Sequence, residues 1–268
     1  METLNAAPGI DVITTTIGVP GFGLIPVNAF VLHGTEPVLV DTGPVVERDQ
    51  FLETLSTVID PADLRWIWLS HPDFDHIGSL HALLEANREL RVVTTFLGMG
   101  IMGLFAPPPL DRAYLVNPGQ AISVGDRRLR AFRPPTFDNP STTGFRDESS
   151  GVVFSSDCFG ALLQEVPRRA DELSDEDLRA GQQVWATVDA PWLHAVDAAT
   201  LTKHLDSVRA MEPALVLSSH LPPAPGDLVD RMVANLAGVP EAEPFVGPDQ
   251  QAMEQMMAAM MSAPAASG

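Results

Sequence analysis

The stretch SHPDFDHIGSL, residues 70–80, decides the fold and the chemistry that this sequence predicts. It follows an apolar run that predicts a buried strand, and the residues after it have helical spacing. The turn between strand and helix carries four side chains that can bind a metal ion within six residues. They are His71, Asp73, Asp75 and His76. Because so many ligands at one strand end are seldom a chance feature of a surface, we interpret the turn as a metal site.

The spacing of these four residues indicates which of them can share an ion. In an extended loop, residues i and i+2 face the same way, so His71 and Asp73 can bind one ion together. Asp75 and His76 lie where the turn tightens and can face a second ion. The turn therefore predicts two neighbouring metal ions at the end of its strand.

The rest of the chain predicts a layered α/β domain. Short apolar, β-branched runs predict strands at 27–33, 37–43, 64–70, 91–96, 120–124, 128–133, 151–157 and 214–220. Helical spacing predicts helices over 47–59 and 79–90, and roughly over 172–186, 198–211 and 226–237. Strands come mostly before residue 160 and helices dominate after it. This order fits mixed layers better than a strictly alternating parallel sheet.

Residues 1–238 are expected to form one domain, and 239–268 a C-terminal extension. Methionines in the extension recur at helical spacing and predict a short helix with one apolar side. They are Met253, Met256, Met257, Met260 and Met261. The helix either docks on the core or makes a dimer or partner contact. The last residues, 262–268, are expected to fray.

The composition excludes several classes of protein. Of 268 residues, 16 are Lys or Arg and 35 are Asp or Glu, which gives a net charge of −19. Nucleic acids and anionic membranes present phosphates that would repel such a chain, so neither is an expected partner. The single cysteine, Cys158, excludes a disulfide framework and a multi-cysteine zinc site. The longest apolar stretch, 96–106, is too short to cross a bilayer. With no signal peptide at the start, we expect a cytoplasmic protein.

The turn at 70–80 resembles the signature His-x-His-x-Asp-His of the metallo-β-lactamase superfamily. Further ligands in that superfamily stand at the ends of later strands, where this chain has Asp157 and His220. Asp41 stands at the usual end of an earlier strand. The resemblance covers about residues 12–225 and implies the αββα sandwich of the metallo-β-lactamase type.

Two features are similar to the flavodiiron, oxygen-binding branch of this superfamily. That branch commonly has a carboxylate at the second signature position, where hydrolases have His and this chain has Asp73. The segment FSSDCFGA (154–161) also looks like the segment that supplies a metal-bridging Asp. The branch expects one more His, and the corresponding position in PTFDNP (135–140) is Asp138. Asp138 is either the substitute ligand or a turn residue beside a weakened metal site.

The resemblance implies two ions that share Asp157. One would be held by His71, Asp73, Asp138 and Asp157, and the other by Asp75, His76, His220 and Asp157. Such an oxygen-rich set favours iron or manganese over zinc, although zinc stays possible. Asp41 is interpreted either as a residue that orients a ligand His or as a turn cap. His194 is a candidate catalytic residue that lines the pocket, and Cys158 is expected to face the core.

Three functions remain open. The first is a di-iron protein that binds, reduces or activates O2 or NO. Without an FMN-binding flavodoxin domain in this chain, it would take electrons from a separate donor. The second is a hydrolase of phosphodiesters, thioesters, lactones or amides, in which Asp75 orients a metal-bridging hydroxide and His220 or His194 serves the leaving group. The third is a degenerate binding protein, with Asp138 as the sign of decay. Any of them could form a homodimer and would bind a small molecule.

Overall fold

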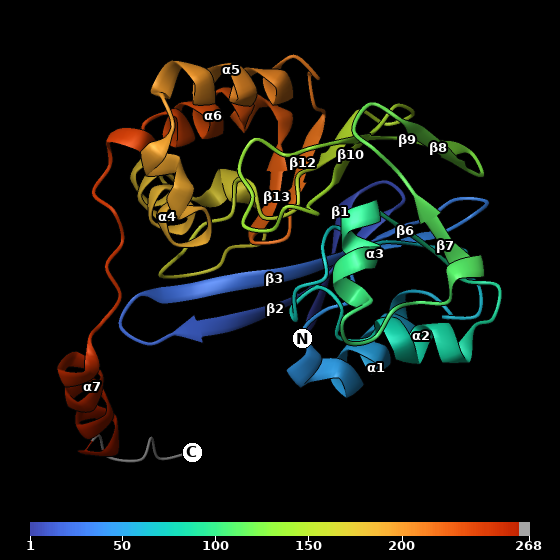
Figure 1. Ribbon diagram of the computed structural model, residues 1–268, viewed down its shortest axis with the longest axis horizontal. Coiled ribbons are helices and arrows are strands. Elements are labelled where there is room, and N and C mark those ends of the chain that lie inside the picture. Colours follow the sequence, from blue (N-terminus) through green and yellow to red (C-terminus); the bar gives the residue numbers. More distant parts are fainter. Residues whose placement is uncertain (263–268) are drawn as a thin grey trace.

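The computed structural model describes residues 1–262, with side chains as far as residue 258, and arranges them in four layers. Two β-sheets face each other in the middle, and helices cover the outer face of each (Figure 1). The chain thus forms the αββα sandwich that was predicted.

The first sheet contains seven strands in sequence order. They are β1 (Glu2–Ala7), β2 (Ile10–Val19), β3 (Gly23–Leu32), β4 (Val38–Val40), β5 (Trp66–Trp68), β6 (Arg91–Thr94) and β7 (Ala113–Leu115). Its outer face packs against α1 (Arg48–Val58), α2 (Leu80–Ala86) and α3 (Phe96–Met102).

The second sheet contains six strands. In spatial order they are β13 (Leu221–Pro225), β12 (Leu215–Ser218), β11 (Val152–Phe154), β10 (Gly144–Asp147), β9 (Arg127–Phe132) and β8 (Ala121–Val124). Its outer face packs against α4 (Asp175–Asp189), α5 (Ala198–Arg209) and α6 (Val229–Ala237).

The central strands are buried on both faces, which explains their uninterrupted apolar sequences. In β4 and β5, Val40 and Trp68 point between the sheets, while Leu39 and Ile67 point toward the helices. Between the sheets, the ring of Trp68 lies 4.9 Å from that of Phe145. This aromatic pair packs the two sheets against each other.

The hairpin of β2 and β3 is the longest in the molecule and extends beyond the first sheet beneath α4 (Figure 1). Near its tip, Leu24 forms an isolated bridge with Leu163, which follows β11. The sequence predicted a strand only from residue 27 and none over 10–19. All ten residues of each strand pair, because valine, isoleucine and threonine give a run that fits a half-buried sheet.

Other differences from the predicted elements concern short or atypical segments. The strands β1, β7, β10 and β13 and the helix α3 were not predicted. β13 contains three prolines and lies at an edge of its sheet, where a missing N–H costs little. The predicted helix over 172–186 lies three residues further along, because Ser174 caps its start by accepting from the N–H of Asp177.

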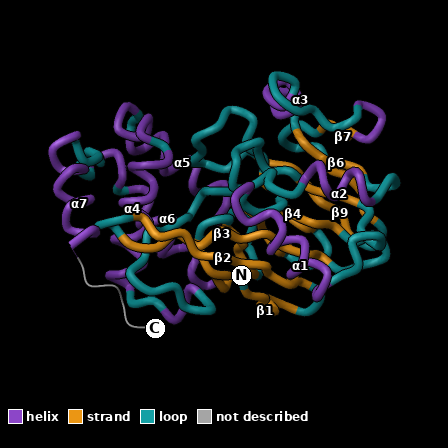
Figure 2. Tube along the Cα trace, turned by 90° about the horizontal axis from the view of Figure 1, so that it is seen from below, coloured by secondary structure: helices purple, strands orange, loops and turns teal. Residues whose placement is uncertain are grey.

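The Met-rich segment forms α7 (Gln250–Ser262), which lies at the end of the molecule beside α4 and far from α1 and α2 (Figure 2). Met253, Met256 and Met257 face α4 and the tip of the β2–β3 hairpin. The side chains of Met260 and Met261, and residues 263–268, lie outside the described part of the chain, and the division at residue 238 stays a prediction. No helix within 1–262 is long and apolar enough to span a membrane.

Candidate metal centre

The candidate centre lies where parallel strands of both sheets end. β4 runs parallel to β5 in one sheet, and β11 runs parallel to β12 in the other. Asp41, His71, Asp157 and His220 follow these four strands within three residues. Since the carboxyl ends of parallel strands meet at one edge, the fold brings together side chains that are up to 179 positions apart in the sequence (220 − 41).

One half of the centre contains two imidazoles. The Nε2 atom of His76 lies 3.4 Å from an Asp75 carboxylate oxygen and 3.4 Å from Oδ1 of Asp157. The Nε2 atom of His220 lies 3.4 Å from the same Asp75 oxygen and 3.3 Å from the same Asp157 oxygen. Both imidazoles are almost fully buried. We call this half the imidazole-rich half.

The other half contains one imidazole and several carboxylates. The Nε2 atom of His71 lies 3.2 Å from Oδ2 of Asp157, 3.8 Å from Asp138 and 3.9 Å from Asp73. His71 is 1% exposed, whereas the side chains of Asp73 and Asp138 are 41% and 28% exposed. We call this half the carboxylate-rich half. Asp157 joins the two, because each of its oxygens faces a different one.

Each histidine is held at its Nδ1 atom, so that its Nε2 atom points into the centre. His76 donates from Nδ1 to Asp41 at 2.9 Å, and His220 donates to the carbonyl of Pro26 at 3.0 Å. The Nδ1 atom of His71 lies 3.1 Å from the hydroxyl of Ser70. Partners of this kind fix the tautomer and the ring orientation of metal-binding histidines. Of the two interpretations of Asp41, the geometry favours the orienting residue.

Two of the nitrogen donors in the centre lack a hydrogen-bond partner and could be satisfied by a metal ion. The Nε2 atoms of His71 and His76 are buried and have no hydrogen-bond partner among the described residues. Buried polar atoms without a partner cost stability, and such exceptions call for an explanation. A cation at each half would supply the missing partner, because a neutral imidazole with Nδ1 occupied presents a free lone pair at Nε2.

The backbone around the centre adopts the left-handed conformation at residues other than glycine, among them Asp41 and Ser156. Asp41 has φ of 57° and Ser156, which precedes Asp157, has φ of 52°. Such left-handed conformations cost free energy in L-residues and cluster at functional sites. Hydrogen bonds from the N–H and hydroxyl of Ser70 to Asp41 stabilise the first of these turns. These conformations occur at or next to the two carboxylates, Asp41 and Asp157, that face histidines.

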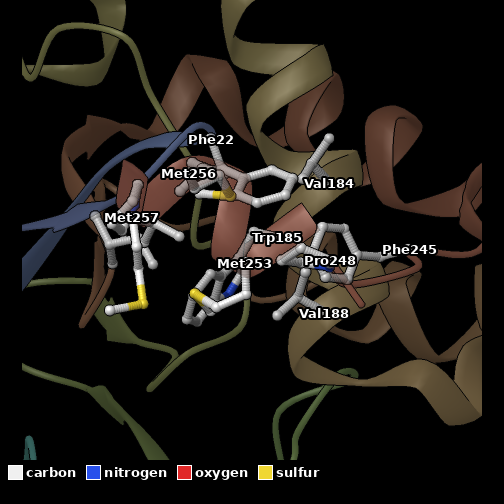
Figure 3. A pocket seen from close by; sticks show the side chains of 13 residues that line it. Phe22, Val184, Trp185, Val188, Phe245, Pro248, Met253, Met256 and Met257 are labelled. Carbon is white, nitrogen blue, oxygen red and sulfur yellow. The ribbon is translucent and has the colours of Figure 1, made fainter. Parts of the chain in front are cut away.

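Trp185 of α4 forms one wall of the imidazole-rich half. Its ring lies 4.7 Å from that of His220, and its N–H donates to the backbone carbonyl of Asp157. Gly160 permits this contact, since a Cβ there would lie 2.4 Å from the indole nitrogen. On its other side, Trp185 lines an apolar cavity of about 330 Å³ with α7 and the hairpin tip (Figure 3).

The charges in the centre shift several pKa values. Burial lowers the pKa of His71, which favours its neutral form. At His220, burial is outweighed by the carboxylates of Asp157 and Asp75, which raise its pKa to about 9. The pKa of His76 is raised well above its ordinary value, because Asp75, Asp157 and Asp41 outweigh burial there. The three imidazoles lower the pKa of Asp157 against the effect of its burial.

The sequence reasoning missed one carboxylate of the centre, Asp189. It is the last residue of α4 and lies close to Asp138 and Asp157, with one oxygen of each of the three within 4.8 Å of the others. Burial, together with Asp157 and Asp138, raises the pKa of Asp189 to about 8. Burial and the carboxylates of Asp157 and Asp73 raise that of Asp138 to about 7. No local motif marks Asp189, because only the packing of α4 brings it here.

The predicted site residues are brought together with one exception. His71, Asp73, Asp75, His76, Asp138, Asp157 and His220 all belong to the clusters of possible ligands. His194 belongs to none of the clusters among the described residues and lies in the short helix 191–195. Its neighbour Trp192 donates to the carbonyl of Phe137, next to Asp138. The catalytic role of His194 stays a prediction, as do the roles of the ligands.

Comparison with known proteins shows a family. Residues 22–220 match the model of the metallo-beta-lactamase superfamily. The rubredoxin-oxygen oxidoreductase of Megalodesulfovibrio gigas is 26% identical over 168 residues, which are 62% of this chain and 41% of that protein. The chain therefore spans less than half the length of this curated relative.

Solved structures show the same fold. The rubredoxin oxygen:oxidoreductase from Desulfovibrio gigas superposes with a TM-score of 0.79 at 18% identity, over 91% of this chain and 63% of that one. A fragment of a putative diflavin flavoprotein from Nostoc superposes with a TM-score of 0.73 at 17% identity, over 90% of this chain and 96% of the fragment. The predicted metallo-β-lactamase fold, with its likeness to flavodiiron cores, is confirmed.

Proposed function

The chain belongs to the metallo-beta-lactamase superfamily, and we propose that it is a binuclear metalloprotein, with iron preferred, that binds, reduces or activates O2 or NO. The observation that carries the proposal is the position of Asp157, whose two oxygens face separate groups of nitrogen and oxygen donors. A carboxylate so placed can join two ions. When bound, two ferrous ions would each supply an electron to a diatomic ligand.

The donor set supports iron. Four carboxylates (Asp73, Asp75, Asp138 and Asp157) and three imidazoles would surround two divalent ions, so the charges balance. Oxygen-rich sets suit iron or manganese, whereas zinc prefers nitrogen and sulfur. The name of one relative, a rubredoxin-oxygen oxidoreductase, points to the same chemistry.

The surrounding residues prepare the centre for a small ligand. Asn139 donates to Asp73 at 2.9 Å and orients that carboxylate. The side chains of Asp73, Asp75 and Asp138 are 41%, 32% and 28% exposed, whereas those of the three histidines are nearly inaccessible. A small molecule would therefore reach the centre past the partly exposed carboxylates of Asp73, Asp75 and Asp138. Electrons would come from a separate donor, and a homodimer is part of the proposal.

Metal analysis tests the proposal most directly. Protein is purified without oxygen from cells given both iron and zinc, beside an Asp157→Asn variant prepared identically. We expect about two irons per chain in the wild type, far less in the variant, and a ferric absorption band that bleaches on reduction and returns in air. Two zinc ions without that band would overturn the iron proposal and favour the hydrolase. Metal-free wild-type protein would favour the degenerate binding protein.

A further inference from the structure

Asp189 occupies a position that is unfavourable for a carboxylate unless a cation is present. It ends α4, where the backbone carbonyls carry partial negative charge. The same helix has Asp175, Glu176 and Asp177 in its first turn, where acidic residues are favourable. Asp189 therefore reverses the charge pattern of its own helix. A local rule broken in this way marks a site whose compensation lies elsewhere in the structure.

The surroundings of Asp189 add further negative charge. Oxygens of Asp138, Asp157 and Asp189 lie within 4.8 Å of one another. Among the ion pairs of the described residues, none joins Asp189 or Asp138 to an Arg or a Lys. Like charges at this distance repel strongly in a partly buried site. A bound cation would remove a repulsion that no Arg or Lys of the described residues offsets.

A second, independent feature points to a ligand at the same place. The buried Nε2 atom of His71 lacks a hydrogen-bond partner, and it lies 3.2 Å from Asp157 and 3.8 Å from Asp138. This nitrogen thus adjoins Asp157 and Asp138, and both of these carboxylates adjoin Asp189, so donors from four segments of the chain gather here. Nitrogen and oxygen donors of this kind are the ones that iron, manganese and zinc accept.

We propose that Asp189 is a ligand of the ion in the carboxylate-rich half, beside His71, Asp138 and Asp157. This inference rests on the proposed metal binding and adds to it a residue from α4. It also explains how the site tolerates Asp138 where a histidine is expected. Asp138 is shorter than the expected histidine, and Asp189 supplies a second carboxylate beside it. This half therefore has oxygen donors in place of one nitrogen donor and favours a harder cation.

Cobalt(II) titration tests this role, because the absorption of cobalt reports its coordination. Metal-free wild type, Asp189→Asn and the control Glu176→Gln, an exposed change on the same helix, are titrated with and without a competing chelator. We expect two cobalt ions per chain in the wild type and the control. In Asp189→Asn, one ion should bind as before and the other about 10–100-fold more weakly with an altered spectrum.

The thermal unfolding of the metal-free proteins separates ligation from packing. Asp189→Asn has nearly the same shape and carries no charge. At pH 9, where Asp189 is ionised, its metal-free Tm should therefore equal or exceed that of the wild type. A lower Tm with unchanged cobalt binding would mean a structural residue and would overturn the inference. Two ions bound with wild-type affinities and spectra would also overturn it. Wild-type protein that binds no cobalt would overturn the proposed metal function along with it.

Discussion

The two halves of the candidate centre share Asp157 but are built differently. In the imidazole-rich half, His76 and His220 are held at Nδ1 by Asp41 and Pro26 and are nearly inaccessible to solvent. In the carboxylate-rich half, the Nε2 atom of His71 faces the carboxylates of Asp73, Asp138 and Asp157. There Asp73 and Asp138 stand 3.9 and 3.8 Å from its Nε2 atom and are partly exposed.

In the proposed centre, Asp157 would serve one half with fixed imidazoles and one half with partly exposed carboxylates. Fixed imidazoles give the first half a defined geometry and nitrogen donors, which bind most divalent transition metals firmly. The second half has mostly oxygen donors, and two of its carboxylates, Asp73 and Asp138, are partly exposed. We therefore expect the imidazole-rich half to fill first, and the carboxylate-rich half to decide which metal completes the centre.

Removing the shared residue should have the largest effect. Asp157→Asn deprives both halves of a charged donor, so metal content should fall from about two ions per chain to well below one. Elemental analysis after dialysis measures this. Asp63→Asn, an exposed change far from the centre, serves as the control. Retention of two ions in Asp157→Asn would show that the halves are independent.

Removing an imidazole should empty only one half. His220→Gln is expected to lower the metal content from two ions to one, because Asp75 and His76 are left without a second nitrogen. The matched control is His204→Gln, an exposed histidine on α5. Metal titration by calorimetry separates the two binding steps. A loss of both ions would contradict the division into halves.

The dependence of metal affinity on pH should be the next largest effect. Without metal, Asp138 (pKa about 7), Asp189 (pKa about 8) and His220 (pKa about 9) hold protons more tightly than usual. The pKa of His76 is also raised well above its ordinary value. Metal binding must displace these protons, so affinity should rise about tenfold per pH unit for each proton displaced between pH 6 and 8. Calorimetry in two buffers of different ionisation enthalpy counts the protons.

The same shifts give the sign of the metal-free stability. Groups with a raised pKa stabilise the fold below their unfolded values, and this contribution is lost as pH rises through the folded ones. For Asp138 and Asp189 the loss runs from about pH 4 to about pH 8, and for His76 and His220 it begins near pH 6.5. The metal-free Tm should therefore fall between pH 5 and 9, while the rise in Tm on adding metal grows. A metal-free Tm that increases over this range would contradict these shifts.

The substitution with the smallest expected effect, Asp138→His, would make the two halves more alike. Asp138→His restores a nitrogen donor to the carboxylate-rich half and should tighten zinc there by about tenfold. Competition with a chromogenic chelator measures the change, with Asp63→Asn again as the control. If zinc affinity stays the same, Asp138 is a turn residue and the asymmetry between the halves has another origin.

Candidate ligands that lie close together in the sequence could be predicted from it, whereas ligands from distant segments could not be predicted from the residues alone. His71, Asp73, Asp75 and His76 could be proposed together because one turn holds them. Asp157, His220 and Asp138 required the resemblance to a family, since only its fold relates distant strand ends. Asp189 could not be proposed, because its position depends on how α4 packs against the second sheet. Within the fold, β13 was missed because three prolines obscure an edge strand.

The buried thiol of Cys158 can report local opening of the structure around it. It is fully buried next to Asp157, and burial raises its pKa to about 12, so the folded protein resists alkylation. It is also the single cysteine in the chain. Any labelling by a thiol reagent therefore times the local opening of the turn that carries the shared carboxylate. Slower labelling upon metal addition would measure, without any assay of turnover, how much the metal stabilises this turn against local opening.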